Sequence, residues 1–277
     1  MTDEAPPGAK GQGRSVTDEA PAGVKERRRV VLLAVEGPPT NVVFHALERA
    51  FGPVEVVIEE KVPRWQLVRG RYRRLGLWPV LGQLAFLGAV QPALVRRSRA
   101  RVREILAEAG LDEGPIDPAR VQRVGSVNTP EARDRLRRLA PTVVVLNGTR
   151  IVGRETLRCV QAPFLNMHAG ITPRYRGVHG GYWALVEGRP DLVGTTVHLV
   201  DEGIDTGRVV EQTFFRPGPR DSFATYPSLH LAAGLPALVR AVRRALEGTL
   251  ETVPGPDEPS RLRYHPTAWG YLRARVR

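Results

Sequence analysis

The sequence predicts one α/β domain of Rossmann-like type, with a mostly parallel central sheet and helices on both faces. Three observations favour this class. Short apolar runs typical of buried parallel strands occur at residues 29–35, 54–58 and 141–146. Turns and stretches with helical periodicity alternate with these runs. The chain of 277 residues, 42% of them apolar, is also long enough to bury a large core.

The first strand–turn–helix unit opens the domain. A strand at residues 29–35 is followed by a turn at 36–41 and an amphipathic helix from about residue 42 to 51. The turn contains two prolines, which donate no hydrogen bond, so it is unlike the glycine-rich loops that bind phosphate. Thr40 and Asn41 retain two interpretations, contact with an acceptor molecule or N-capping of the helix.

The second quarter of the chain is basic and then mostly helical. A strand at 54–58 leads into an arginine-rich segment, and a helical region at 75–109 follows, with breaks expected at Pro79 and Pro92. A short strand is predicted at 120–124. A helix capped by Thr129, with Pro130 at its first position, should run to residue 139. Three aromatic side chains of the basic and helical region are expected to pack inside: Trp65, Tyr72 and Trp78.

The stretch at 164–207 is the most distinctive part of the chain. Residues 164–168 alternate in the manner of a strand, so Asn166 and His168 should project from the same side. A further strand at 197–200 opens into an acidic turn, in which Gly203 and Gly207 are expected to supply a positive φ. His198, on this strand, points either inward or toward the site.

An amide, an imidazole and a carboxylate at one edge of a sheet suffice for acylation of an amine. The amide hydrogen-bonds a developing oxyanion, the imidazole moves the proton, and the carboxylate orients the imidazole and raises its pKa. On the residues alone, Asp201 and Asp205 are equal candidates for the carboxylate.

Five blocks in this stretch carry a family resemblance. N-M-H, G-I-T-P-R-Y-R-G, G-G-Y-W-A-L, G-T-T-V-H and D-E-G-I-D-T-G, in this order, resemble the folate-dependent formyltransferases that act on glycinamide ribonucleotide, methionyl-tRNA or nucleotide sugars. The resemblance implies Asn166, His168 and Asp205 as catalytic residues and 10-formyltetrahydrofolate as formyl donor. Residues 169–173 read A-G-I-T-P where the family usually has P-S-L-L-P, a departure in the loop near the acceptor.

The resemblance also implies the walls of the site. In the polar loop at 173–181, which is expected to be flexible and to close over the substrate, Arg176 or His179 is a candidate for contact with an acidic acceptor; equally, Tyr175 and Arg176 brace the loop against the body. The slot for the pterin of the donor is expected to be lined by two loops: Gly148, Thr149, Arg150, Ile151 and Val152 from the first, and Asp201, Glu202, Gly203 and Ile204 from the second.

The function predicted from these residues is formyl transfer to a primary amine of a small molecule, an amino sugar or an amine of specialised metabolism. Two alternatives stay open: hydrolysis of 10-formyltetrahydrofolate, and a non-catalytic scaffold whose basic surface binds an acidic carrier protein. The resembling methionyl-tRNA enzymes carry a β-barrel after the catalytic domain, whereas the residues after 215 suggest helix. A tRNA acceptor is therefore disfavoured. No metal site is expected.

Domain organisation and environment complete the prediction. Residues 1–27 are expected to be disordered, 28–215 to form the catalytic domain, and 216–277 to form a helical extension with a basic tail. Asp221 should cap a helix to residue 247, with Trp269 and Tyr271 anchoring the tail. No stretch approaching 18 uncharged apolar residues is expected, so the sequence predicts a cytoplasmic protein without membrane contact.

The charge and the cysteine content limit the possible partners and cross-links. The net charge is +12, but the arginines are scattered with few aromatic residues among them, so nucleic acid is not expected to bind. A homodimer is compatible with the sequence. The single cysteine, Cys159, excludes an internal disulfide.

Overall fold

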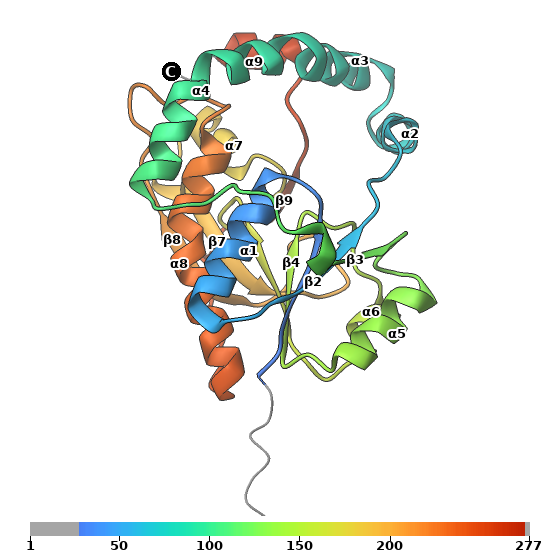
Figure 1. Cartoon of the computed structure of the whole chain (residues 1–277). Coiled ribbons are helices and arrows are strands. Elements are labelled where there is room, and N and C mark those ends of the chain that lie inside the picture. Colours follow the sequence, from blue (N-terminus) through green and yellow to red (C-terminus); the bar gives the residue numbers. More distant parts are fainter. Residues whose placement is uncertain (1–27, 275–277) are drawn as a thin grey trace, which may run out of the picture.

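A seven-stranded sheet forms the centre of the protein in a computed structural model that describes residues 28–274 (Figure 1). The segment predicted to be disordered lies outside these residues. The strands within them are β1 (Val30–Val35), β2 (Glu55–Glu59), β3 (Val121–Val124), β4 (Val143–Asn147), β5 (Phe164–His168), β6 (Tyr175–Gly177), β7 (Gly194–Leu199), β8 (Val209–Phe214) and β9 (Arg261–Arg263). The sheet order is β3-β2-β1-β4-β5-β7-β8, parallel up to β5 and antiparallel from there on. The predicted fold class is confirmed.

Helices cover both faces of the sheet. Helices α1 and α8 lie on one face, and α5 and α6 on the other (Figure 1). The helical segments are α1 (Pro38–Phe51), α2 (Arg64–Leu75), α3 (Leu77–Ala85), the π-helix η1 (Phe86–Val90), α4 (Gln91–Glu108), the 3₁₀ helix η2 (Pro118–Arg120), α5 (Pro130–Leu139), α6 (Arg154–Leu157), α7 (Gly180–Val186), the 3₁₀ helix η3 (Pro190–Leu192), α8 (Tyr226–Glu247) and α9 (Ala268–Ala274).

Strand β1 shows how the sheet divides the core. Leu32 and Ala34 contribute to the core shared with α1 and α8, whereas Val31 and Leu33 contribute to the core shared with α5. Successive side chains of a strand point to opposite faces, so an uninterrupted apolar run is what a doubly covered strand requires. The apolar run at residues 29–35 therefore supplies core side chains to both faces of the sheet.

Helix α1 begins earlier than the sequence suggested. Its N-cap is Gly37, and Pro38 and Pro39 occupy the first turn, where a missing N–H removes no helical hydrogen bond. The predicted capping role of Thr40 and Asn41 is therefore wrong. The Thr40 hydroxyl donates instead to the Val35 carbonyl at 2.6 Å.

Three expectations for the region from α2 to α4 are wrong. The break lies at Gly76, and the helical path then continues from Leu77 to Glu108 without interruption at either proline. Residues 75–95 carry no charge, so the expectation that no long uncharged window exists is wrong. The segment Leu77–Glu108 is long and apolar enough to cross a membrane by length and composition alone, and only 22% of its most apolar window is buried. The three aromatic residues expected inside are exposed by 62%, 54% and 73%: Trp65, Tyr72 and Trp78.

Helix α8 packs into the main core. Leu235, Leu238 and Val242 are buried in the cluster that also contains β1 and β2 residues. The helix predicted to run to residue 247 thus packs against the sheet formed by the preceding residues. Asp221 does not cap α8, whose N-cap is Thr225; its carboxylate pairs with Arg101 instead.

The rest of the C-terminal region is extended before it becomes helical. Strand β9 pairs in parallel with β6, so the loop at 173–181, expected to be flexible, is held by a two-stranded sheet. Tyr175 in β6 is fully buried. Of the two expected tail anchors, Tyr271 contacts the Phe86 and Tyr182 rings, and the Trp269 ring packs on Gly82 of α3 while remaining 48% exposed.

Candidate active site

Strand β5 places the amide and the imidazole at the carboxyl end of the sheet. Asn166 pairs across the strands with Leu146 of β4 and His198 of β7, and His168 pairs with Thr196. Asn166 and His168 are two residues apart, so their side chains leave the same face of β5. The predicted orientation of these two residues agrees with the structure.

The loop after β7 brings Asp205 to them. Its Oδ2 lies 3.3 Å from His168 Nδ1 and accepts a hydrogen bond of 2.8 Å from the Gly177 backbone N–H. Its Oδ1 lies 3.4 Å from Asn166 Nδ2. The structure therefore brings together all three side chains predicted to be catalytic, with Asp205 rather than Asp201 as the carboxylate.

The conformation of this loop differs from the prediction. Asp205 itself has a positive φ of 50°, and neither Gly203 nor Gly207 does. The two glycines are required by space instead. A Cβ at Gly207 would lie 1.7 Å from the Leu199 carbonyl oxygen, and one at Gly203 would lie 1.9 Å from Thr206 Oγ1. Asp201 supports the turn, since its Oδ1 accepts hydrogen bonds from the Gly203 N–H and the Thr206 hydroxyl.

His168 has an acceptor beside each ring nitrogen. Nε2 lies 2.6 Å from the Tyr175 carbonyl oxygen, which can only accept, so Nε2 carries a proton. Burial lowers the pKa of His168 below its ordinary value of 6.5, while the Asp205 carboxylate and the Tyr175 carbonyl raise it by less. The expected rise in this pKa is therefore wrong. At neutral pH the ring is neutral, and Nδ1 is left able to accept one proton beside Asp205.

His198 belongs to the same cluster and fixes the orientation of Asn166. Its Nδ1 lies 2.7 Å from the Leu199 carbonyl oxygen and donates to it, which leaves Nε2 facing Asn166 and, at 3.6 Å, Asp205 Oδ1. The Asn166 amide nitrogen lies 3.1 Å from that Nε2. His198 was expected to point either inward or toward the site, and its side chain faces the site.

Asp205 is held ionised by its surroundings. Burial would raise the pKa of Asp205, but the adjacent imidazoles of His198 and His168 and the Gly177 N–H together lower it below its ordinary value of 3.8. An ionised Asp205 next to a neutral His168 is the charge arrangement that accepts one further proton at the imidazole.

A slot of about 380 Å³ opens beside this cluster. Asn166, His168 and Asp205 form part of its wall. The volume is in the range of ligand sites in proteins, and the wall mixes apolar side chains with backbone in the manner of a cofactor site. The two loops expected around a pterin provide most of the remaining wall: Gly148, Thr149, Arg150, Ile151, Val152, Asp201, Gly203 and Ile204.

A buried carboxylate holds the first of these loops. Glu59, 2% exposed, accepts hydrogen bonds from the Arg150 backbone N–H at 2.6 Å and the Val127 N–H at 3.1 Å. Its Oε2 also lies 2.7 Å from Arg150 Nε. The guanidinium of Arg150 is therefore directed to Glu59 and to the carbonyl of Glu60, and Arg150 borders the slot mainly through its backbone.

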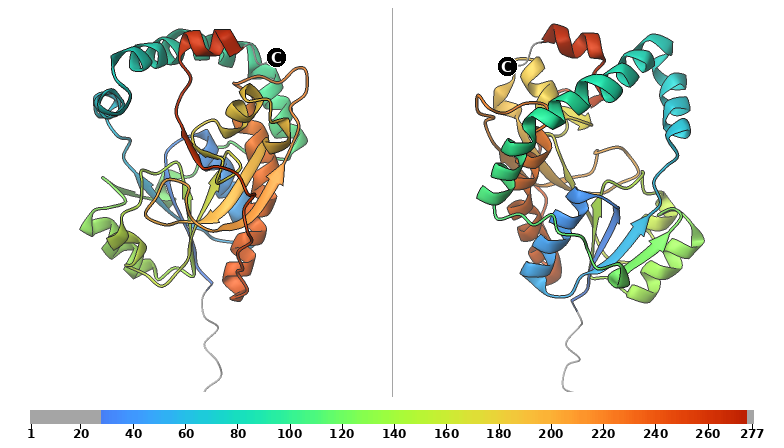
Figure 2. Two further views of the ribbon diagram at one scale, coloured as in Figure 1. Left: turned by 180° about the vertical axis from the view of Figure 1, so that it is seen from behind. Right: turned by 45° about the horizontal axis from the view of Figure 1, so that its top comes forward.

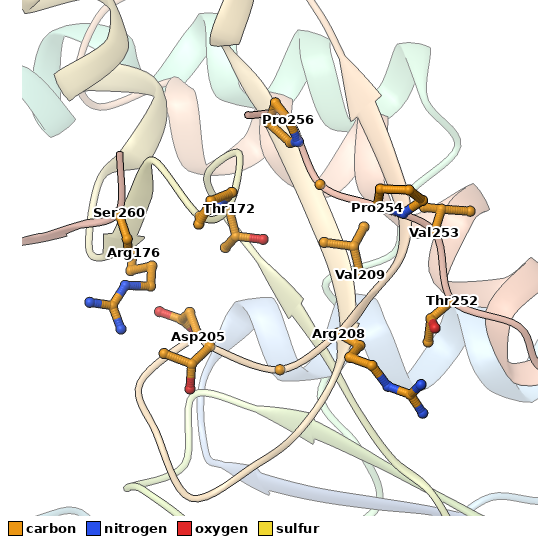
Figure 3. Close-up of a pocket in the computed structure, with 14 residues that line it drawn as sticks. Thr172, Arg176, Asp205, Arg208, Val209, Thr252, Val253, Pro254, Pro256 and Ser260 are labelled. Carbon is orange, nitrogen blue, oxygen red and sulfur yellow. The ribbon is translucent and has the colours of Figure 1, made fainter. Parts of the chain in front are cut away.

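A second hollow of about 560 Å³ shares Asp205 with the slot (Figure 3). Thr172, Arg176 and Arg208 line it from the catalytic domain, and residues 252–256 line it from the segment after α8. Arg176 Nη1 donates to the Ile204 carbonyl at 3.1 Å, so this guanidinium is partly fixed. In Figure 3 the Asp205 side chain lies between those of Arg176 and Arg208.

Four predicted site residues lie elsewhere. Glu202 is exposed and pairs with Arg154 rather than lining the slot. Asn41 Nδ2 donates to the Glu113 carbonyl, and the Thr40 hydroxyl is occupied inside the protein, so neither borders the two hollows. His179 packs on Phe223 and hydrogen-bonds His265, which makes it a brace and not an acceptor contact.

Two contributors to the site were missed from the sequence. Glu59 ends an apolar strand, and a charged residue at the carboxyl end of a buried strand is a signal that was available. The Tyr175 carbonyl had no such signal, because its approach to His168 depends on the β6–β9 pairing. Within residues 28–274, no group of three or more His, Cys, Asp or Glu side chains is placed to hold a metal ion.

Comparisons with known proteins agree with this architecture. Residues 94–242 match the family described as formyl transferase. A methionyl-tRNA formyltransferase from Anaeromyxobacter dehalogenans is 33% identical over 187 residues, which cover 62% of this chain and 60% of that protein. The chain thus spans only about three fifths of the length of this relative.

Two solved structures share the fold. A sugar N-formyltransferase from a Shewanella species superposes with a TM-score of 0.54 at 14% identity, covering 85% of this chain and 76% of the other. An N-formyltransferase from Helicobacter canadensis, crystallised with folinic acid and dTDP-3-aminofucose, gives a TM-score of 0.50 at 16% identity, covering 85% and 70%.

Proposed function

Because this chain belongs to the formyl transferase family, we propose that it transfers a formyl group from 10-formyltetrahydrofolate to a primary amine of a small molecule. One observation carries the proposal. Asn166, His168 and Asp205 meet within hydrogen-bonding distance in the wall of a slot built from two glycine-containing loops. An amide, a neutral imidazole and an ionised carboxylate are the groups that acylation of an amine requires.

The slot is suited to the donor. Its apolar wall includes Ile151, Val152 and Val200, which can contact the faces of a flat ring, and its volume of about 380 Å³ is adequate for such a group. The related fold crystallised with folinic acid supports the same assignment. When bound, the donor supplies the formyl carbon, and the folate nitrogen that it leaves takes up a proton.

His168 accepts the proton that the amine loses as the new carbon–nitrogen bond forms. The ring enters the reaction neutral because burial lowers its pKa, and Nδ1 is its free basic atom. Once Nδ1 is protonated, both ring nitrogens have acceptors, Asp205 at 3.3 Å and the Tyr175 carbonyl at 2.6 Å. The cationic ring is thus stabilised only after the proton has been transferred, and it can return this proton to the leaving nitrogen.

Asn166 and Asp205 have the two remaining roles in the proposed formyl transfer. One amide hydrogen of Asn166 is held by His198 at 3.1 Å, while its approach to Asp205 is long at 3.4 Å. The second hydrogen makes only this long contact and can turn to the formyl oxygen as negative charge develops there. Asp205 orients the His168 ring and compensates its positive charge.

The hollow beside Asp205 provides a place for the acceptor. Asp205 forms part of the wall of both hollows, so an amine bound in the second one lies next to the group that controls His168. Arg176 and Arg208 there suit an acceptor with phosphate or carboxylate groups, such as a nucleotide-linked amino sugar. The amino-sugar nucleotide bound by the Helicobacter canadensis enzyme supports this acceptor class.

Aminoacylated tRNA is a second candidate acceptor. It is favoured by the sequence relative from Anaeromyxobacter dehalogenans, which is named as a methionyl-tRNA formyltransferase. The two acceptors place different demands on the protein: a nucleotide sugar fits within a hollow of about 560 Å³, whereas a tRNA contacts a wide basic surface.

The test is an assay of folate release from 10-formyltetrahydrofolate. The protein is incubated with the donor alone, with nucleotide-linked amino sugars and with methionyl-tRNA, and the formylated product is identified by mass spectrometry. Release that requires an amino sugar supports the proposal. Release only with methionyl-tRNA selects the second candidate, release without any amine indicates hydrolysis, and no release under any condition indicates a non-catalytic scaffold.

Arg208→Gln is expected to raise the KM for an anionic acceptor about tenfold, because the acceptor loses one charge-assisted hydrogen bond. The Kd of the donor should not change, because Arg208 lines only the second hollow. Steady-state kinetics and donor titration measure the two effects. Arg138→Gln, at an exposed position of α5, is the matched control. An equal rise in both constants would contradict the separation of the two subsites.

A further inference from the structure

The helical segment that stands beyond the carboxyl edge of the sheet presents an apolar outer surface. Figures 1 and 2 show α3 and α4 along the top of the molecule, with α2 at one end of them. We define the α2–α4 surface as the exposed side chains of residues 64–97. Its large apolar members are all more than two fifths exposed: Trp65, Leu67, Tyr72, Leu77, Trp78, Leu81, Leu84 and Val95.

Helix α3 shows that this exposure is not a consequence of loose packing. Its inner side is anchored: Val80 and Phe86 are buried, and Gln83 Nε2 donates to the His265 carbonyl at 3.0 Å. Its outer side places Leu77, Leu81 and Leu84 at helical spacing, with Trp78 beside them and no polar residue between. A helix that directs polar Gln83 inward and leucines outward has a surface suited to an apolar partner.

The charge around this surface has one sign. Residues 61–103 contain eleven basic and no acidic side chains, compared with a net charge of +12 for the whole chain. The basic residues lie in two groups, at 61–74 and 96–103, on either side of the uncharged stretch. Within residues 28–274, only Arg101 of these eleven forms ion pairs, with Asp221, Glu104 and Glu108.

We propose that the α2–α4 surface docks the protein peripherally on an anionic lipid bilayer. Such a surface offers an apolar interior for leucine side chains, anionic head groups for arginines and an interface that tryptophan and tyrosine prefer. The segment lies on the bilayer and does not span it, because the Phe86 ring is fixed against Phe223 and Tyr271 in the body of the protein. From the sequence, no membrane contact was predicted because no long apolar window was expected. The uncharged stretch at 75–95 contradicts that expectation.

Other occupants fit the surface less well. A second copy of the chain would place arginine groups against arginine groups in both parallel and antiparallel packing, since both ends of the apolar stretch are basic. A nucleic acid would satisfy the arginines but leave Leu77, Leu81 and Leu84 without an apolar partner. A bilayer satisfies both parts of the surface. The proposal is independent of which acceptor is formylated.

Co-sedimentation with vesicles tests the proposal. The full chain is mixed with vesicles of phosphatidylcholine and phosphatidylglycerol, or of phosphatidylcholine alone. We expect binding to the anionic vesicles that weakens as salt is added, because screening reduces the arginine contribution. The double variant Trp78→Ser/Leu81→Ser should lower the partition coefficient about tenfold or more. Arg69→Gln/Arg73→Gln should lower it by about the same factor.

The controls keep the outcome decisive. Phe214→Ser removes an equally large exposed apolar side chain from β8, 56% exposed, and should leave binding unchanged. Circular dichroism establishes that each variant is folded. Equal sedimentation with both vesicle types, or with neither, would overturn the proposal. A dimer that Trp78→Ser dissociates, in a protein that does not bind vesicles, would overturn it in favour of a second copy.

Discussion

Replacement of His168 by alanine is expected to lower kcat for formyl transfer by about 10²–10⁴, the range typical for removal of a positioned proton acceptor. The imidazole of His168 is the buried base beside Asp205; His198 also borders the slot, but its Nδ1 is engaged by the Leu199 carbonyl and its Nε2 faces Asn166, and His230 lies outside the slot. Steady-state kinetics with saturating donor and acceptor measure the loss. The affinity for the donor should remain close to that of the wild type, because the loops that line most of the slot are unchanged.

The controls for this prediction separate chemistry from folding. His45→Ala removes an imidazole whose Nε2 contacts the Gly114 carbonyl, remote from the slot, and should leave kcat unchanged. The wild-type activity should be constant near neutral pH and fall as the pH drops below the pKa of His168, which burial holds under 6.5. In Asp205→Asn the residual activity should fall at a lower pH than in the wild type, because the charge that raises this pKa is gone. Full activity of His168→Ala would rule out the mechanism.

Glu59→Ala is expected to destabilise the protein by about 3–5 kcal/mol, the cost of breaking a buried ion pair by removing one partner. Three groups lose their acceptor: the Arg150 and Val127 backbone N–H groups and the Arg150 guanidinium. Equilibrium unfolding in urea measures the effect. Because Glu59 also fixes the loop that lines the slot, the KM for the donor should rise as well.

The adjacent residue supplies a matched control. Glu60→Ala removes an exposed carboxylate but keeps the backbone carbonyl that accepts from Arg150, so it should change stability by less than about 0.5 kcal/mol. Glu59→Gln retains an acceptor and a donor of the same shape and should lie between the two. If Glu59→Ala and Glu60→Ala unfolded at the same urea concentration, the anchoring role would be refuted.

Local sequence patterns were sufficient for most of the sheet. The apolar runs that became β1 and β4 lie between two helical layers, and a strand buried on both faces has no position where a polar residue is tolerated. The helix start at Thr129 and Pro130 was also predicted correctly, since capping depends on neighbouring residues alone. These elements were predictable because the forces that form them act over a few residues.

Long-range pairing accounts for most of the errors. The loop at 173–181 looked mobile because it is polar, but β9 holds it from 86 residues away, as in the pairing of Tyr175 with Arg261. The pKa of His168 was expected to rise because Asp205 was anticipated, whereas burial has the larger effect. Trp65 and Trp78 were expected inside because aromatic residues usually are, yet no other part of the described chain covers them.

The sequence by itself determined the order of the strands along the chain, the two loops that line most of the slot, and the three side chains placed beside it. The tertiary structure alone decided that Glu59 anchors the loop at Arg150 and that the leucines of the uncharged helix α3 face outward. The physical reason is that residue type and spacing fix which groups a strand or turn can present. Burial, charge state and exposure depend on which distant segments pack against them.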